Sequence, residues 1–332
     1  MNGQAFGRWR LWLWVVALVL IGGLCSGNAG ATEPTTRIRD HLYAAYLLSA
    51  DEGWVIGSFG AIYYTNDRGK QWQKQDSGVV EPLYGVSFVS AKEGWISGKS
   101  GLILHTTDGG ATWEKQITGT TYHLFNLTFL DNQRGLAVGD YGIILQTTDG
   151  GKTWQDRTPG EDVFLYAVAM HESGKAWIAG EMGTILVSED GGETWEKRET
   201  GSEASLLGLS FTDDTSGCAV GMDGTILQSS DGGATWTAYE SPVQTALYNV
   251  AIKGQIGWAV GDEGVILSST DGGKNWRLID APVELSLFWL MGMSVVSNSH
   301  GATHGILTGS NGLALFTEGT QVDFGERFGN QK

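Results

Sequence analysis

An eight-residue motif that ends in tryptophan recurs along the chain at almost constant spacing. Its copies read TTDGGATW at 106–113, TTDGGKTW at 147–154, SEDGGETW at 188–195, SSDGGATW at 229–236 and STDGGKNW at 269–276, with a weaker TNDRGKQW at 65–72. The closing tryptophans are 41 residues apart, and the last interval is 40. A repeat of this length with strand-like patterning inside each unit is typical of propeller blades.

Each unit reads as four short strands, and residues 83–117 illustrate the pattern. An alternating apolar run opens at Leu83, and a second apolar run covers 95–98. Gly98 and Gly101 frame a two-residue tip, which is a strong hairpin signal. Residues 102–104 form the third strand, and the motif turns the chain into a fourth at 112–113. Four antiparallel strands make one blade.

The repeats can be counted to the end of the chain. Inner strands are predicted to start near Leu42, Leu83, Leu124, Leu165, Leu206 and Leu247, and a seventh, motif-free blade runs from about Leu287 to Phe324. Terminal repeats are often atypical. The sequence therefore predicts an all-β fold, a single seven-bladed β-propeller of four-stranded antiparallel blades over 32–332. Whether residues 33–40 add a strand to the last blade stays open.

The recurring aspartates and tryptophans of the motif have a structural interpretation. An Asp can accept bonds from backbone N–H groups of its own turn, and the following glycines supply positive φ. The tryptophan can bury its ring between sheets. Copies spaced evenly around a ring cannot converge on one substrate, so we expect turn-forming and packing roles rather than an active site. The residues are Asp67, Asp108, Asp149, Asp190, Asp231, Asp271, Trp72, Trp113, Trp154, Trp195, Trp236 and Trp276.

The first 31 residues differ from the rest. Arg8 and Arg10 precede an apolar run over 11–24, and small residues follow up to Ala31. This pattern predicts a secretory signal peptide, 1–31, cleaved after Ala31, with an uncleaved anchor as the alternative. We therefore expect a periplasmic or secreted protein, in the thylakoid lumen if the organism is photosynthetic. Cleavage leaves Cys218, which sits in an apolar strand pattern and is predicted to be a core residue.

Acidic residues dominate the charge. The 37 Asp and Glu outnumber the 21 Lys and Arg, for a net charge of −16. Such a surface repels phosphates, which argues against nucleic acid and anionic lipid heads as partners. Composition alone favours solubility as the reason for this charge, and a basic or cationic partner is the alternative. We expect a monomer that binds a protein partner, from the membrane or the periplasm.

The variable hairpin tips are the candidate docking residues. Loops of a propeller converge on the faces of the ring, and framing glycines hold the tips while the residues between them vary. Four consecutive tips carry carboxylates, and the links between blades should reach the same face. Turn preference alone also favours Asp at such tips. The predicted partner-binding residues are Asp140, Tyr141, Glu181, Asp223, Asp262 and Glu263.

Signals for catalysis are weak. The six histidines show no metal-ligand spacing. His300 and His304 are four residues apart, but they lie in a Gly-rich stretch where no helix is expected to bring them to one face. The chain has no nucleophile elbow, P-loop or dinucleotide fingerprint. Paired carboxylates for glycoside hydrolysis could come from the acidic tips, but their abundance makes any pair uninformative. We therefore predict no catalytic residues, no metal and no cofactor.

The repeated motif resembles that of two families. The S/T-x-D-x-G-x-T-W turn is similar to the Asp-box, or BNR, repeat of sialidases and other propeller glycosidases. Those enzymes also need three arginines that grip a carboxylate, which this chain matches only faintly at 36–39. The resemblance makes a carbohydrate-binding or sialidase-like glycoside hydrolase propeller the alternative function.

The full unit, L-x-x-V-x-F…G-W-x-V-G-x-x-G-x-I-L-x-T-x-D-G-G-x-T-W, resembles the photosystem II stability and assembly factor family over essentially the whole chain after residue 31. The resemblance implies an exported seven-bladed propeller that binds a membrane or periplasmic protein complex as an assembly scaffold, without catalysis. Photosynthetic members dock through an arginine-rich patch, whereas the tips of this chain are acidic.

Overall fold

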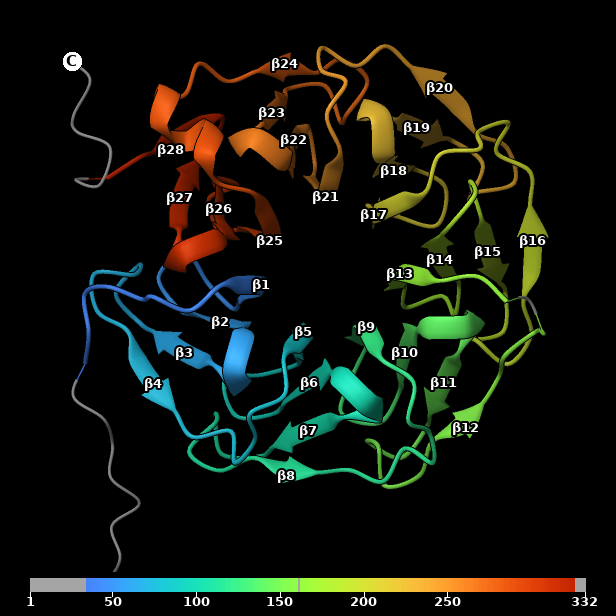
Figure 1. The fold of residues 1–332 in the computed structure, drawn as a ribbon. Coiled ribbons are helices and arrows are strands. Elements are labelled where there is room, and N and C mark those ends of the chain that lie inside the picture. Colours follow the sequence, from blue (N-terminus) through green and yellow to red (C-terminus); the bar gives the residue numbers. More distant parts are fainter. Residues whose placement is uncertain (1–33, 161, 326–332) are drawn as a thin grey trace, which may run out of the picture. The chain divides into compact units, whose positions relative to one another are not determined.

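Seven four-stranded antiparallel sheets follow one another around a central opening in the unit Thr32–Lys332 (Figure 1). The computed structural model describes residues 34–160 and 162–325, so the predicted signal peptide lies outside the described residues. The all-β, seven-bladed prediction is confirmed. Within the described ranges, no helix has the length and apolar character needed to cross a membrane.

The two inner strands of every blade follow the predicted period. The innermost strands are β1 (Leu42–Leu47), β5 (Leu83–Phe88), β9 (Leu124–Phe129), β13 (Leu165–Met170), β17 (Leu206–Phe211), β21 (Leu247–Lys253) and β25 (Leu290–Ser297). The second strands are β2 (Gly53–Gly57), β6 (Gly94–Gly98), β10 (Gly135–Gly139), β14 (Ala176–Gly180), β18 (Gly217–Gly221), β22 (Ile256–Gly261) and β26 (Thr303–Gly309).

The outer half of each blade is shorter and more exposed. The third strands are β3 (Ile62–Thr65), β7 (Ile103–Thr106), β11 (Ile144–Thr147), β15 (Ile185–Ser188), β19 (Ile226–Ser229), β23 (Ile266–Ser269) and β27 (Ala314–Glu318). The outer strands are β4 (Gln73–Gln75), β8 (Glu114–Lys115), β12 (Gln155–Asp156), β16 (Glu196–Arg198), β20 (Thr237–Tyr239), β24 (Arg277–Leu278) and β28 (Gln321–Asp323).

Short 3₁₀ turns complete the fold. Six connect second and third strands: η1 (Ser58–Gly60), η2 (Lys99–Gly101), η3 (Asp140–Gly142), η4 (Met222–Gly224), η5 (Asp262–Gly264) and η7 (Ser310–Gly312). The seventh, η6 (Val283–Leu287), lies in the link between blades 6 and 7.

The sequence-based boundaries need two small corrections. The last inner strand starts at Leu290 rather than near Leu287, because η6 lengthens the preceding link. The fourth strand of a blade starts one residue after the motif tryptophan, at Glu114 in the second blade, since the box turn takes up residues 107–113.

Packing between neighbouring sheets forms the core. Seven clusters of buried side chains each join two successive blades, so both faces of every sheet are covered. At three interfaces a tryptophan of one blade stacks on a phenylalanine of the next. These pairs are Trp54–Phe88, Trp95–Phe129 and Trp177–Phe211, with centroids 3.7–3.8 Å apart. Removing one such buried ring costs about 3–5 kcal/mol.

At two other interfaces, smaller side chains stand in place of both the tryptophan and the phenylalanine. Leu136 and Met170 belong to the cluster between blades 3 and 4, and Cys218 and Ile252 belong to the cluster between blades 5 and 6. Cys218 is fully buried, as predicted, and burial raises the pKa of its thiol to about 12. A buried thiol with so high a pKa is unreactive, so it acts as a small apolar side chain.

The segment before β1 closes the ring without adding a strand. All four strands of the last blade are its own, and Thr35 pairs instead with Trp72 of blade 1. In five earlier blades, a Cβ on the last glycine of the tip would overlap a carbonyl of the following link, as Gly101 would with Thr120. For Gly312 of the last blade, that carbonyl belongs to Ile38. Residues 35–41 thus serve as the seventh link, which settles the open question.

Replacement of Gly312 by Ala should therefore loosen the ring at its closure. The new Cβ would overlap the Ile38 carbonyl, and the residue has φ +69, so we expect a loss of about 2–4 kcal/mol in the free energy of unfolding. Gly319→Ala is the control, because its φ is also positive but no atom lies within 4 Å of the new Cβ. Equal urea midpoints for the two variants would contradict this account of closure.

Candidate functional site

Tips and inter-blade links share one face of the ring, which we call the tip face. Backbone bonds connect them: Asp140 N–H donates to the His123 carbonyl at 3.0 Å, and Met222 N–H donates to the Ser205 carbonyl at 3.0 Å. The same bond recurs from Ser58, Lys99, Glu181, Asp262 and Ser310 to the link beside each. Loops from all seven blades therefore reach this face together.

The first residue of a tip often fastens the link through its side chain. Asp140 Oδ2 accepts the His123 N–H at 2.9 Å, and Glu181 Oε2 accepts the Phe164 N–H at 3.0 Å. Ser58 and Ser310 hydroxyl oxygens do the same at blades 1 and 7. Glu181 also accepts the Tyr166 hydroxyl at 3.3 Å. Asp140 is buried, so these two predicted residues hold the loops as well as contribute charge.

The second residue of every tip has a left-handed backbone and projects outward. Its φ lies between 51 and 59° in all seven blades, at Phe59, Ser100, Tyr141, Met182, Asp223, Glu263 and Asn311. Residues other than glycine adopt this backbone conformation at a cost in free energy, and such strained residues are concentrated at functional sites. Of the predicted residues, Tyr141, Asp223 and Glu263 occupy this position and are exposed, and Asp262, the first residue of its tip, is exposed as well.

A β-bulge interrupts the pairing of each innermost strand with the second strand, and it redirects one side chain per blade. In each innermost strand the register skips the second residue, as between Leu42 and Ala44 in β1. Bulges redirect side chains in this way. The bulged residues form a collar, one from each blade: Tyr43, Tyr84, Phe125, Tyr166, Leu207, Tyr248 and Met291.

Aromatic rings of the collar contact one another from blade to blade. Trp289 stacks on Tyr43 at 5.8 Å, and contacts of 5.7–6.0 Å continue through Tyr84 and Phe125 to Tyr166. Burial raises the pKa of Tyr84, and the nearby Asp140 carboxylate adds to the effect. The collar was not predicted from the sequence. The signal was present as the pair Leu-Tyr, Leu-Phe, Leu-Leu or Leu-Met that opens each inner strand.

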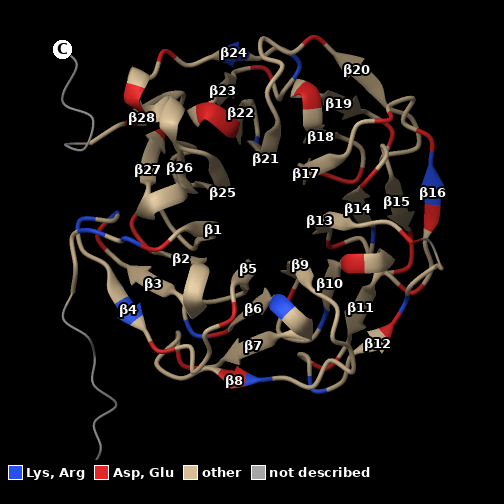
Figure 2. Cartoon of the chain, viewed as in Figure 1, with Lys and Arg blue, Asp and Glu red and all other residues tan. Residues whose placement is uncertain are grey.

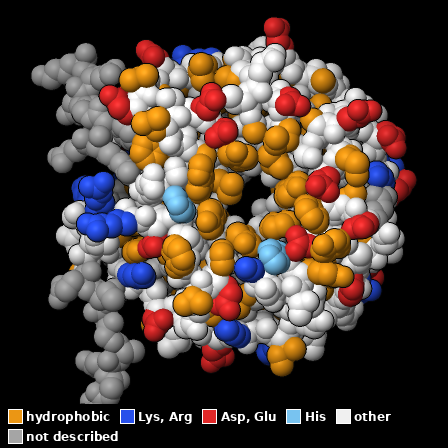
Figure 3. All heavy atoms as spheres, in the orientation of Figure 1, with side chains coloured by type: hydrophobic (Ala, Val, Ile, Leu, Met, Phe, Trp, Pro, Cys, Tyr) orange, Lys and Arg blue, Asp and Glu red, His pale blue; other side chains and the backbone are white. Residues whose placement is uncertain are grey.

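Exposed hydrophobic side chains gather on the tip face. Figure 3 views this face and shows hydrophobic side chains around the central opening and over the loops. Tips and links supply Phe59, Val80, Tyr122, Tyr141, Met182, Met222, Val283 and Leu287, which are 43–82% exposed. The other large exposed hydrophobics in the described part of the chain, Ile117, Tyr239 and Leu278, lie on or next to outer strands. Exposed apolar patches of this kind are typical of interaction surfaces in soluble proteins.

The motif turns lie at the other end of each third strand, away from the tips. In the second blade, Asp108 Oδ1 accepts the Thr112 N–H at 2.9 Å, and Oδ2 accepts the Thr112 hydroxyl at 2.7 Å. The remaining motif aspartates repeat the first bond, except that Gln71 and Asn275 replace threonine. Trp72 is buried, while the other five motif tryptophans are half-buried between blades.

Hydrogen bonds hold the pKa of two of the motif carboxyls well below the usual range. The side-chain and backbone bonds from Thr235 lower the pKa of Asp231 to about 2, and those from Asn275 do the same for Asp271. Within residues 34–160 and 162–325, no three His, Cys, Asp or Glu side chains are grouped so as to hold a metal ion.

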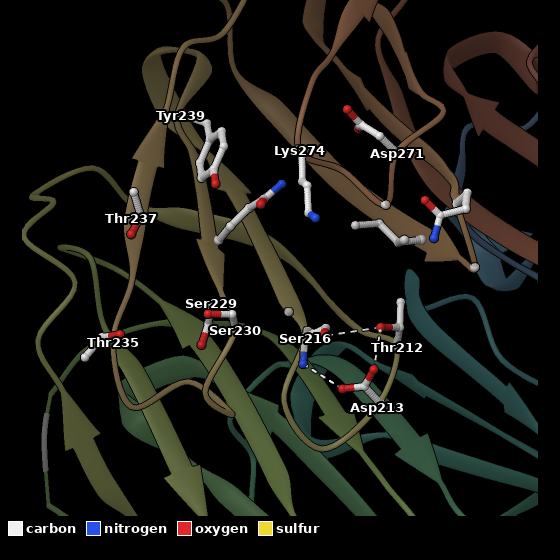
Figure 4. A pocket seen from close by; sticks show the side chains of 16 residues that line it. Thr212, Asp213, Ser216, Ser229, Ser230, Thr235, Thr237, Tyr239, Asp271 and Lys274 are labelled. Atoms are coloured by element: carbon white, nitrogen blue, oxygen red, sulfur yellow. Dashed lines mark hydrogen bonds between the residues drawn. The ribbon is translucent and has the colours of Figure 1, made fainter.

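A hollow of about 710 Å³ opens between blades 5 and 6 on the motif side of the ring (Figure 4). Tyr239, Asp213, Asp271 and Lys274 line it, and Ile252 stands at the interface where the small Cys218 replaces a tryptophan. Bonds from Thr215 lower the pKa of Asp213 to about 2. Both carboxylates are thus ionised, whereas glycoside hydrolysis needs one protonated acid of raised pKa.

The family model described as photosynthesis system II assembly factor YCF48 matches the chain three times in succession, over residues 35–121, 115–202 and 195–286. The chain belongs to this family. No curated protein matches the sequence. The matched span starts within the link before β1 and ends in η6, so the motif-free last blade lies beyond it.

Solved structures share the propeller fold at low sequence identity. YCF48 bound to a D1 peptide is 23% identical, with a TM-score of 0.68, over 84% of this chain and 91% of that one. YCF48 from Cyanidioschyzon merolae is 20% identical, with a TM-score of 0.69, over 84% and 95%. A GH74 xyloglucanase from Xanthomonas campestris is 12% identical, with a TM-score of 0.69, over 85% and 52%. At these identities the likeness concerns the fold.

The motif carboxylates predict an acid-sensitive stability. A pKa of about 2 in the folded protein, against about 3.9 when unfolded, stabilises the fold above pH 4 and is lost as pH falls from 4 to 2. Asp231→Asn should unfold at lower urea concentration than the native protein at pH 7, and the difference should shrink at pH 2.5. A difference in urea midpoint that is equal at both pH values would contradict this role.

Proposed function

We propose that this chain is a non-catalytic, exported scaffold that binds a membrane or periplasmic protein complex during its assembly or stabilisation, with the tip face as its docking surface. The observation that carries the proposal is the gathering of exposed hydrophobic side chains on that face. Membership of the assembly-factor family supports it, and the solved YCF48 in complex with a D1 peptide is a propeller of this fold with a bound polypeptide.

The geometry favours protein binding over hydrolysis. Left-handed tips present exposed side chains of varied chemistry, and the collar adds a half-buried aromatic arc beside them. Interfaces of this kind are anchored by aromatic and other large side chains on a preformed surface. Tyr141, Asp223, Asp262 and Glu263 are the predicted contact residues that project from the tips, while Asp140 and Glu181 position the links.

The rival function, a carbohydrate-binding or sialidase-like propeller, finds less support. Arginines with side-chain bonds are spread over the described ring. Arg68 pairs with Glu318, Arg134 with Asp131, and Arg198 with Glu196, while Arg157 bonds to Gln146 and Arg277 to Ser268. They therefore do not form the three-arginine grip of a sialidase. Binding of the native protein to a glycan array, with no protein captured in cells, would favour the rival.

A surface variant tests the docking proposal. Phe59, Tyr141, Met182, Met222 and Leu287 are each replaced by Ser, which already occupies the left-handed tip position at Ser100. The tagged chain is crosslinked in its native host, and captured proteins are identified by mass spectrometry. We expect the native chain to recover a protein complex and the variant to recover at least about tenfold less, since central contacts dominate binding energy.

The matched control carries Tyr239→Ser and Leu278→Ser, two exposed hydrophobic residues on the outer strands β20 and β24. It should capture the complex as the native chain does, and all three proteins should share one melting temperature within a few degrees. Capture of nothing above background by the native chain, or equal capture by the five-residue variant, would refute the proposal.

Export is tested separately. A cleaved signal predicts that the protein recovered from outside the cytoplasm starts at Thr32, which its intact mass establishes. An intact mass that includes residues 1–31 would show a retained anchor, and protein confined to the cytoplasm would contradict export.

A further inference from the structure

The link between blades 6 and 7 departs from the repeat and carries the most exposed hydrophobic side chains of the tip face. Innermost strands start 41 residues apart up to Leu247, but β25 starts 43 residues later, at Leu290. The longer link forms η6, on which Val283 is 79% and Leu287 82% exposed. Because apolar side chains are rarely grouped in water without a partner, this lengthened link is a candidate binding site.

Packing fixes the position of η6. Leu285, between the two exposed residues, is 1% exposed and belongs to the core of the interface between blades 6 and 7. The Leu285 N–H donates to the Pro282 carbonyl at 2.9 Å. A Cβ on Gly264 would overlap the Leu285 carbonyl, so the two backbones lie in close contact. The turn thus lies directly on tip η5. Val283 and Leu287 are held outward by a buried anchor, so little conformational entropy would be lost when they bind.

The surroundings of η6 are acidic throughout. Asp262, Glu263 and Glu284 are exposed beside it, and Asp223 follows the half-exposed Met222 on the neighbouring tip. The tips and links of this sector, residues 199–205, 222–224, 240–246, 262–264 and 279–289, contain no Lys or Arg. Figure 2 shows acidic residues on the short helical turns of this part of the ring. Basic residues of the other tips and links are Arg37, Arg39, Lys99 and Arg157.

We infer that η6 and tips η4 and η5 form a docking sector for a cationic polypeptide segment that carries apolar side chains. This inference rests on the proposed function and names the chemistry of the partner. Apolar residues of the segment cover Met222, Val283 and Leu287, and its Lys or Arg residues face the surrounding carboxylates. Complementary charge speeds association and excludes acidic partners, while the buried apolar contacts supply most of the affinity.

The test uses the full mature chain and two labelled 12-residue peptides, in which Leu alternates with Lys or with Glu. Fluorescence anisotropy should show binding of the Leu-Lys peptide that weakens as salt rises, and no binding of the Leu-Glu peptide. Val283→Ser with Leu287→Ser should weaken binding at least about tenfold, as should Asp223→Lys with Asp262→Lys and Glu263→Lys.

Two controls separate this sector from general attraction to an acidic protein. Glu114→Lys with Glu172→Lys and Glu193→Lys makes the same charge change away from the tips, and Ile117→Ser removes an exposed apolar side chain outside the sector. Both should bind the Leu-Lys peptide within about twofold of the native chain. Equal loss in the Glu114 set, or native-like binding by both sector variants, would overturn the inference.

The outcomes distinguish the inference from the proposed function. Capture of a protein complex that persists when the sector is altered would leave the scaffold function standing and refute the docking sector. Loss of capture in the sector variants supports both. Binding of uncharged lipid vesicles that depends on Val283 and Leu287 would assign the sector to a membrane surface and refute a polypeptide occupant.

Discussion

The whole ring depends on one constraint: a four-stranded blade cannot bury both faces of its sheet by itself. Each sheet is covered only by its neighbours, so every blade needs two partners and the series must close. The stacked pairs such as Trp95 and Phe129 supply the largest contacts, and the interface residues change size together where the tryptophan is absent. Closure then requires a seventh link, and residues 35–41 provide it.

Because the blades form a fixed framework, the side chains on the tip face can differ from blade to blade. The first tip residue, for example Asp140, bonds to the adjoining link, and the framing glycines allow the close approach of the link backbone. The second residue is then free to be Phe, Tyr, Met, Asp or Glu. A surface built from fixed loops with varied side chains is suited to binding a partner without a change of shape. The same arrangement keeps the motif aspartates at the opposite end of the strands, where they stabilise turns.

Family membership and local chemistry contribute different parts of the functional argument. The match over three successive stretches establishes the family, and the fold is shared with two solved YCF48 structures. The character of the docking surface comes from this chain's own residues, because exposed apolar side chains lie among carboxylates around η6. A partner segment that suits this surface must differ in charge from one that suits an arginine-rich patch.

The sequence alone determined the blade count, the strand order within each blade and the turn-forming motif, since a strict 41-residue period and framing glycines act locally. It could not separate Asp140 from Asp223, because both are acidic tip residues and only the contact with a link makes the first one buried. The aromatic collar, the closure by Ile38 and the outward projection of Val283 and Leu287 also required the tertiary structure. Each depends on contacts between blades, which join residues a full repeat or a whole ring apart in the sequence.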